Sequence, residues 1–320
     1  MGSRLVGYRR VSVRPEPRAG IEAPVVVGLG ELLWDDAPDG RRWGGAPANF
    51  ACYAAQFGAQ AWTVSAVGAD EAGASLVSCA QAHGVQTCVA KRPDHSTGRV
   101  GVILGVDGVP TYRIDEDSAW DHIPWSRAAS ALAGRVDIVC FGSLAQRHPD
   151  SRGTIHRFLA AAPAHALRVF DVNLRAPYVD SEVVRASIAN ADVLKVNEQE
   201  WQQVSRWFGV DVDFAEGGRA LRDRCGLRWV VRTLGERGSE AVGPEGFYAA
   251  PARPVAPVDT VGAGDAYTAT LAVGLWRGVR PRRLLELSSE VSTCVCTLPG
   301  GAQALPARLL GELRRELMTG

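Results

Sequence analysis

The chain has 320 residues, of which 46% are hydrophobic, and this is enough to fill the core of one large α/β domain. Lys plus Arg and Asp plus Glu each number 35, so the formal net charge is zero, and no basic stripe with interleaved aromatic residues indicates nucleic-acid binding. No stretch has the length of a membrane span. Residues 1–22 carry five arginines without an apolar signal core, which predicts a disordered tail on a cytoplasmic protein.

The first strong element is a run of mostly β-branched residues at 24–30 that ends in glycine. Such a run is typical of a central parallel strand that is buried on both faces. Asp35 follows shortly after it, and open α/β sheets bind their ligands beyond the carboxyl ends of their strands. Asp35 is therefore either a ligand-binding carboxylate or an ordinary turn aspartate.

A glycine turn at 44–45 leads into a helix that has Pro47 near its start. Asn49 lies in the first turn of this helix, where its amide serves either as a helix cap or as a binding group for a hydroxyl. Residues 61–68 predict the next strand, and residues 71–83 predict a helix because their apolar positions recur at helical spacing.

The periodicity changes at residue 98. Apolar residues alternate from Val100 to Val106, a turn is predicted at Asp107-Gly108, and residues 110–114 resume the extended pattern. This hairpin interrupts the regular alternation of strands and helices. It is either a flap over the sheet that can also pair with a second subunit, or a plain edge hairpin.

Strands are next predicted at 136–141, 167–172, 193–196 and 227–233, with helices at 151–162 and 181–189 between them. Polar residues follow these strands: Asn173 and Arg175 after the second, and Lys195, Asn197 and Glu200 around the end of the third. A doubly wound sheet brings such strand ends together into one site. Short strands near 241–242 and 247–249 and helices around 282–296 and 306–317 complete the chain.

The most informative stretch is residues 259–268. Gly262 and Gly264 allow a close approach of the backbone to a phosphate, and the helix that follows offers unpaired N–H groups to an anion. Asp265 lies within this anion site. A carboxylate in the first turn either stabilises the helix through its macrodipole or, because it would repel a bound anion, removes a proton from an attacking hydroxyl.

Seven segments, in order, carry a family resemblance. They are GELLWD (30–35), GGAPANFA (44–51), TGRVGVIL (97–104), DVNLR (171–175), KVNEQE (195–200), TLGERG (233–238) and DTVGAGDAYTATL (259–271). With them the sequence resembles the ribokinase-like (PfkB) sugar kinases, and most closely the bacterial fructokinases. The resemblance implies a ribokinase-like, doubly wound and mostly parallel sheet flanked by helices in residues 23–320. It also implies a small β-hairpin lid with elements near 35–43 and 98–116.

The resemblance implies a role for each matching residue. Asp265 would be the catalytic base, and Gly262, Ala263 and Gly264 would form the anion hole. The positions that match sugar-binding residues are Asp35, Gly44, Gly45, Asn49, Asn173 and Arg175. The positions that match nucleotide-binding residues are Lys195, Asn197, Glu200, Thr233, Gly235, Gly238 and Gly301. Glu200 would act on Mg²⁺ indirectly, and Asp259 would shape a site for a monovalent cation such as K⁺.

The implied reaction is transfer of a phosphoryl group from ATP to a primary hydroxyl of a ketohexose, with fructose and fructose 6-phosphate as the favoured pair and a homodimer formed through the lid. Three alternatives remain. A 2-keto-3-deoxygluconate kinase needs an extra cation for the substrate carboxylate, which Arg175 could supply. A nucleoside kinase could stack a base on Trp34, Trp43 or Trp120. A sugar sensor without activity would have no need of Asp265.

Overall fold

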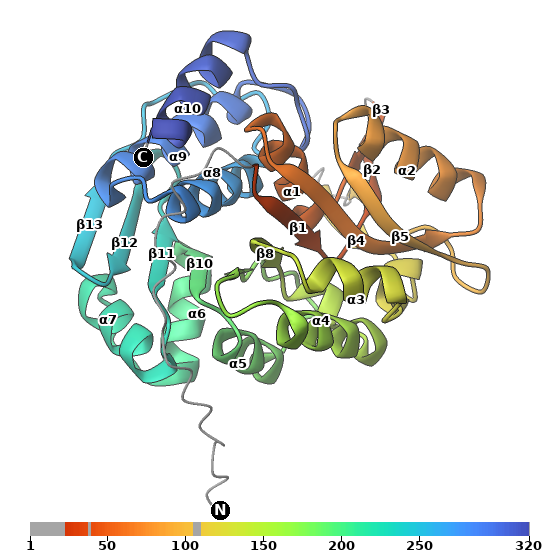
Figure 1. The fold of residues 1–320 in the computed structure, drawn as a ribbon, viewed down its shortest axis with the longest axis horizontal. Coiled ribbons are helices and arrows are strands. Elements are labelled where there is room, and N and C mark those ends of the chain that lie inside the picture. The colour runs from red at the N-terminus through yellow and green to blue at the C-terminus, as the bar shows by residue number, and fades with distance from the viewer. Residues whose placement is uncertain (1–22, 38–39, 105–109, 320) are drawn as a thin grey trace, which may run out of the picture.

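The computed structural model describes residues 23–37, 40–104 and 110–319, and within them two β-sheets organise the chain (Figure 1). The larger sheet has nine strands in the order β13-β12-β11-β10-β9-β8-β1-β4-β5. Its strands are β1 (Val25–Leu29), β4 (Gln60–Gly68), β5 (Gln86–Arg92), β8 (Ile138–Phe141), β9 (Leu167–Asp171), β10 (Val193–Asn197), β11 (Trp229–Thr233), β12 (Ser239–Gly243) and β13 (Gly246–Ala250). All neighbours are parallel except β11–β12 and β12–β13, so the predicted doubly wound sheet is confirmed.

Helices cover both faces of this sheet and bury one hydrophobic core on each (Figure 1). One face carries α1 (Ala46–Gln56), α2 (Glu71–Ala82), α8 (Ala263–Arg277), α9 (Pro281–Cys296) and α10 (Ala307–Thr319). The other carries α3 (Arg127–Ala133), α4 (Pro149–Ala161), α5 (Ser181–Ala189), α6 (Glu198–Phe208) and α7 (Phe214–Cys225). The central strands β8 and β9 are buried along their whole length, as the continuous apolar run of β8 predicts; β9 also buries the charged residues Arg168 and Asp171.

A smaller sheet of four strands lies beside the main one. Its order is β3 (Gly40–Gly44), β2 (Leu33–Ala37), β6 (Arg99–Leu104) and β7 (Pro110–Ile114). The predicted hairpin is the antiparallel β6–β7 pair, and β2 joins it in parallel. The two predicted lid elements are therefore parts of one sheet, which we call the lid. The predicted tail (1–22) and the turn at 107–108 lie outside the described residues.

Several elements were not expected from the sequence pattern. Strand β5 is half-exposed at the sheet edge and lacks a continuous apolar run. Helix α7 contains Gly217 and Gly218, which usually indicate a turn. Here Gly217 permits close packing, because a Cβ on it would lie 2.0 Å from the carbonyl oxygen of Asp211.

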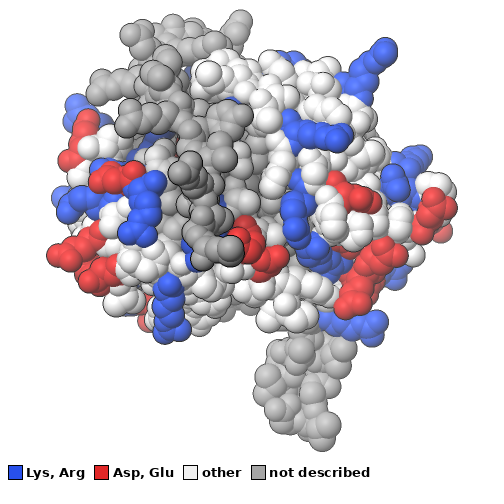
Figure 2. Space-filling model, turned by 90° about the horizontal axis from the view of Figure 1, so that it is seen from below, with Lys and Arg blue, Asp and Glu red and all other residues white. Residues whose placement is uncertain are grey.

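The charged surface agrees with the composition. Basic and acidic side chains are interspersed over the described part of the face in Figure 2, and neither sign forms a large patch there. Within the described ranges, the helices are all too short or too polar to cross a bilayer.

Candidate active site

Helix α8 begins directly after the glycine loop, as residues 259–268 predict. Gly262 caps the helix with a positive φ of 77°. A Cβ on Gly262 would lie 2.0 Å from the carbonyl oxygen of Gly301, so both the backbone conformation and the space require glycine. Ala263, Gly264 and Asp265 form the first turn, where helical N–H groups have no partner within the helix. This end of α8 can therefore receive an anion.

Asp265 is held by a side chain from α1. Asn49 Nδ2 donates a hydrogen bond of 2.8 Å to Asp265 Oδ2. Burial raises the pKa of Asp265 to about 6, although the bond from Asn49 works against the rise. Asn49 Oδ1 is buried without a protein hydrogen-bond partner, so it can accept a bond from a ligand hydroxyl. The structure thus pairs a weak base with a free amide oxygen.

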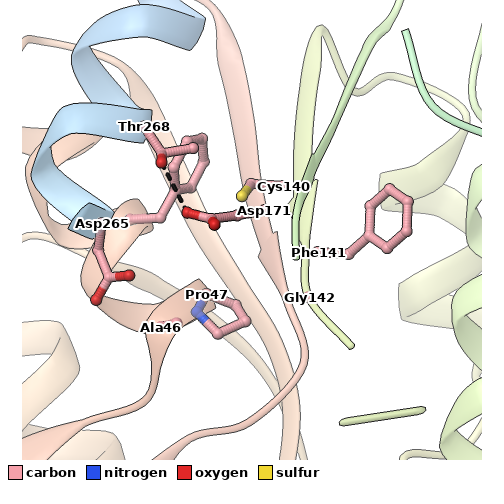
Figure 3. Close-up of a pocket in the computed structure, with 9 residues that line it drawn as sticks. Ala46, Pro47, Cys140, Phe141, Gly142, Asp171, Asp265 and Thr268 are labelled. Atoms are coloured by element: carbon pink, nitrogen blue, oxygen red, sulfur yellow. Dashed lines mark hydrogen bonds between the residues drawn. The ribbon is translucent and has the colours of Figure 1, made fainter. Parts of the chain in front are cut away.

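A small cavity, with room for roughly one water molecule, lies next to Asp265 (Figure 3). Its walls come from α1, from the end of β8, from Asp171 and from α8. The lining residues are Ala46, Pro47, Phe50, Cys140, Phe141, Gly142, Asp171, Asp265 and Thr268. The carboxyl ends of the central strands and the start of α8 therefore meet at one place, as the topology predicts.

A buried ion pair supports the first turn of α8. Lys195 Nζ lies 3.1 Å from both carboxylate oxygens of Asp171, and Thr268 Oγ1 donates to Asp171 Oδ2 over 2.7 Å (Figure 3 shows the latter bond). Burial works against the charge on Lys195, but the carboxylates of Asp171, Glu200 and Asp265 together outweigh it, and the pKa of Lys195 is raised. A Cβ on Gly264 would lie 3.3 Å from Lys195 Nζ. The ammonium group therefore stands beside the predicted anion hole.

Two more carboxyl groups approach the site from the segment after β1. Burial raises the pKa of Asp35 to about 6, and the pKa of Glu31 to about 7. Arg175 is close enough to lower the pKa of both, and the charge of Asp265 raises that of Glu31. Glu31 is only 2% exposed and its Oε2 atom has no protein partner. Glu31, like Asp171, was not among the predicted site residues, although both lie within the segments that carry the resemblance.

The two glycines between Asp35 and α1 make this approach possible. A Cβ on Gly44 would lie 2.4 Å from Asp35 Oδ2. A Cβ on Gly45, whose φ is 108°, would lie 2.3 Å from the carbonyl oxygen of Glu31. Both glycines thus allow the lid strands to reach the start of α1, and their predicted direct contact with sugar stays a prediction.

Asn197 and Glu200 form a capping box at the start of α6. Asn197 Oδ1 accepts from the Glu200 amide over 2.9 Å, and Glu200 Oε2 accepts from the Asn197 amide over 2.8 Å. Glu200 Oε1 also accepts from the amide of Leu174 over 2.9 Å. Glu200 is 5% exposed, so it is a buried carboxylate and not a solvated one on the helix surface. Glu200 instead fixes the backbone between Asn173, whose φ is 46°, and Arg175.

The remaining predicted residues lie on two loops at the same edge of the main sheet. Thr233 ends β11, and Gly235 and Gly238 follow it with positive φ values of 60° and 99°. Asp259 accepts hydrogen bonds of 2.9 Å from the amides of Val261 and Gly300, which ties the loop before α8 to the loop after α9. The roles predicted for these residues in binding nucleotide or a monovalent cation stay predictions.

Gly301 lies against α1 and the start of α8. Its carbonyl oxygen accepts a 3.0 Å bond from the Tyr53 hydroxyl, and a Cβ on it would lie 2.8 Å from Asn49 Nδ2. Gly301 therefore packs between Asn49 and Gly262. Its predicted contact with nucleotide also stays a prediction.

Comparisons with known proteins agree with this geometry. The profile of the pfkB family carbohydrate kinases matches residues 39–308. The chain is 30% identical to a fructokinase of Klebsiella pneumoniae over 308 residues, which cover 90% of this chain and 98% of that one. It is 27% identical to the crystal structure of the sugar kinase PH1459 from Pyrococcus horikoshii in complex with ATP, with a TM-score of 0.76 over 92% of this chain and 99% of that one. The crystal structure of a fructokinase from Xylella fastidiosa with bound ATP shares the fold at 19% identity, with a TM-score of 0.79 over 91% of this chain and 98% of that one. The chain belongs to the pfkB family of carbohydrate kinases.

Proposed function

We propose that the protein transfers the γ-phosphoryl group of ATP to the primary 6-hydroxyl of fructose. The observation that carries the reaction is the position of Asp265. Its carboxylate lies in the first turn of α8 and accepts a hydrogen bond from Asn49. The ammonium group of Lys195, which belongs to β10, lies beside Gly264 of the same helical turn. A base, a set of backbone donors and a cation are thus assembled around one point.

The residues divide the reaction between them. Asp265 accepts the proton of the sugar hydroxyl as its oxygen forms a bond to the γ-phosphorus, while the bond from that phosphorus to the bridging oxygen of ADP breaks. The amides of the predicted anion hole, Gly262, Ala263 and Gly264, and the ammonium of Lys195 stabilise the charge on the phosphoryl oxygens. Asn49 keeps the Asp265 carboxylate in place through its Nδ2 atom and offers Oδ1 to a sugar hydroxyl.

Mg²⁺ would neutralise charge on the ATP phosphates. Glu200 fits the indirect role predicted for it, because each of its oxygens already accepts one backbone amide and retains a second lone pair for a metal-bound water. ATP as the donor is supported by the complex of the Pyrococcus horikoshii relative.

The charge of the sugar pocket favours a neutral substrate. Glu31, Asp35 and Asp265 contribute three carboxyl groups with raised pKa values, and all three are influenced by Arg175. The carboxylate of 2-keto-3-deoxygluconate would add a further negative charge beside them. A neutral ketohexose avoids this repulsion, and the fructokinase of Klebsiella pneumoniae supports fructose as that sugar.

A coupled assay of ADP release tests the substrate. We expect the highest kcat/KM with fructose in a panel that also contains ribose, 2-keto-3-deoxygluconate, nucleosides and a hexose phosphate. Phosphorus NMR of the product should show the ester on carbon 6. A higher kcat/KM with 2-keto-3-deoxygluconate than with fructose would identify the sugar acid as the substrate. A lack of ADP release with every acceptor would favour the alternative of a sugar sensor without activity.

A further inference from the structure

Three of the six histidines of the chain lie together outside the catalytic site. His95, His122 and His148 form a cluster with Asp117 and Asp150. His95 precedes β6 and Asp117 follows β7, so these two residues stand at the two ends of the lid hairpin. His122 ends the short 3₁₀ helix η1 (Ala119–His122), and Asp150 lies in the first turn of α4. The cluster thus lies where the lid joins the main body.

His122 stands between two carboxylates. Its Nδ1 atom lies 2.8 Å from Asp150 Oδ2, and its Nε2 atom lies 2.7 Å from Asp117 Oδ1. A neutral imidazole carries one N–H and can donate to only one of them. The other nitrogen then directs a lone pair at a carboxylate oxygen, which is repulsive. A positive charge at this second contact, either a proton or a metal ion, removes the repulsion.

His95 converges on the same contact. Its ring stacks on that of His122 with centroids 3.7 Å apart, and its Nδ1 atom lies 3.3 Å from the same Asp117 Oδ1. This Nδ1 atom is buried and has no hydrogen-bond partner. Two ring nitrogens therefore lie near one carboxylate oxygen, at 2.7 and 3.3 Å, although in the stacked arrangement the Nδ1 atom of His95 makes no hydrogen bond to it. The Asp117 side chain is 71% exposed, so solvent leaves it room to move back.

We propose that this point is a binding site for a divalent transition-metal cation of the zinc class. His95 Nδ1, His122 Nε2 and the Asp117 carboxylate would be its three protein ligands, with a fourth position open to water. Two imidazoles and a carboxylate suit Zn²⁺ rather than Mg²⁺ or Ca²⁺, which take oxygen ligands. Binding requires the Asp117 oxygen to retreat and the His95 ring to rotate out of its stack.

The surroundings of His122 match those of a metal ligand. A ligating histidine usually donates its other N–H to a carboxylate, and Asp150 is placed to accept the Nδ1–H of His122. His148 is a weaker candidate, because its Nδ1 atom accepts the Asp150 amide over 3.3 Å as the cap of α4. The positive charge of Arg92 opposes a bound cation, because Arg92 is close enough to the cluster to lower the pKa of Asp150. A bound ion would fasten both ends of the lid hairpin to η1.

Titration of the full, tag-free chain tests the site. The protein is stripped of metal with a chelator and titrated with Zn²⁺ by calorimetry, without nucleotide or Mg²⁺, and with Co²⁺ by visible absorption. We expect one Zn²⁺ per chain, a Zn²⁺-dependent rise in melting temperature and the d–d bands of tetrahedral Co²⁺. His95→Gln and His122→Gln should each weaken binding by more than about 10-fold, and Asp150→Asn by about 10- to 100-fold.

The control is His165→Gln, because His165 lies outside the cluster and pairs with Asp137. This variant should bind Zn²⁺ as the native chain does. The seven free cysteines are the competing ligands, and binding that is unchanged in His95→Gln and His122→Gln would assign the metal to them and overturn the proposal. A lack of saturable binding would likewise overturn it and leave a proton on His122. If His122→Gln does not fold, the test depends on His95→Gln alone, because the His95 side chain is partly exposed and its replacement disturbs the core less.

Discussion

Asp265 shows how the surroundings of a single residue set its chemistry. An aspartate in water is too weak a base to remove a proton from a sugar hydroxyl efficiently, and burial beside Asn49 brings its pKa to about 6. At neutral pH the group is still ionised, so it is both more basic and ready to act. The same burial disfavours the ionised form in the folded protein.

Asp265→Asn tests the role of the base. Asparagine has nearly the same shape but cannot accept the proton, so we expect kcat to fall by about 10²- to 10⁴-fold. Sugar binding measured by calorimetry should be largely retained. Because the charged carboxylate is disfavoured by burial, the variant should also be more stable at pH 7, by on the order of 1 kcal/mol after allowance for its partial exposure. Turnover close to that of the native enzyme would exclude Asp265 as the base.

The pH dependence separates Asp265 from Glu31. Because the base must be ionised, kcat/KM should rise with pH through about 6 and then level off, unless Glu31, with a pKa of about 7, must also lose its proton. In that case the rise extends to about pH 7, and Glu31→Gln should remove the upper step. The measurement is the profile of kcat/KM from acidic to mildly alkaline pH for both proteins. A flat profile across this range would contradict both assignments.

At the scale of elements, α6 serves the active site through its cap. Glu200 accepts amides from Asn197 within the helix and from Leu174 in the loop after β9. The helix start and the loop that bears Asn173 and Arg175 are therefore fixed by one carboxylate. This explains why an acidic residue is buried at a position that sequence patterns associate with metal or phosphate.

Glu200→Ala should therefore affect stability and substrate binding together. It leaves two backbone amides without their acceptor, which costs about 1–3 kcal/mol, and it frees the loop that carries Arg175. We expect an earlier urea transition and a higher KM for the sugar. Glu198→Ala is the matched control, because Glu198 lies in the same turn but forms an exposed pair with Arg237. Equal effects of the two variants would show that the capping box has no special role.

The sequence predicts the central elements better than the edges. Continuous apolar runs were sufficient for β1 and β8, whereas β9 was predicted although it carries the buried charged residues Arg168 and Asp171. The sequence pattern does not predict β5, which is half-exposed at the sheet edge, or the full extent of α6, whose start at Asn197 and Glu200 coincides with a binding motif. The position of Glu31 near Asp265 and the histidine cluster both arise from tertiary contacts between distant segments, so a local sequence pattern does not predict them.

At the scale of the whole molecule, the lid is a second sheet with edges of its own. Strands β3 and β7 stand at its two ends, and an unpaired strand edge can join that of another molecule. The predicted homodimer would use this lid. Sedimentation velocity at working concentrations should show a dimer, and a chain that remains monomeric across these concentrations would contradict the prediction.

The lid also has a consequence for the evolution of substrate preference. It is assembled from two separate stretches, 33–44 and 99–114, which are joined by the parallel pairing of β2 with β6. Asp265, the anion hole and Lys195 belong to other segments. Recombination between relatives could thus exchange the lid and leave the residues proposed for phosphoryl transfer intact, but only if both stretches were inherited together. A chimera that exchanges only one stretch would pair a β2 strand from one protein with a β6 strand from another, and their side chains would not be matched.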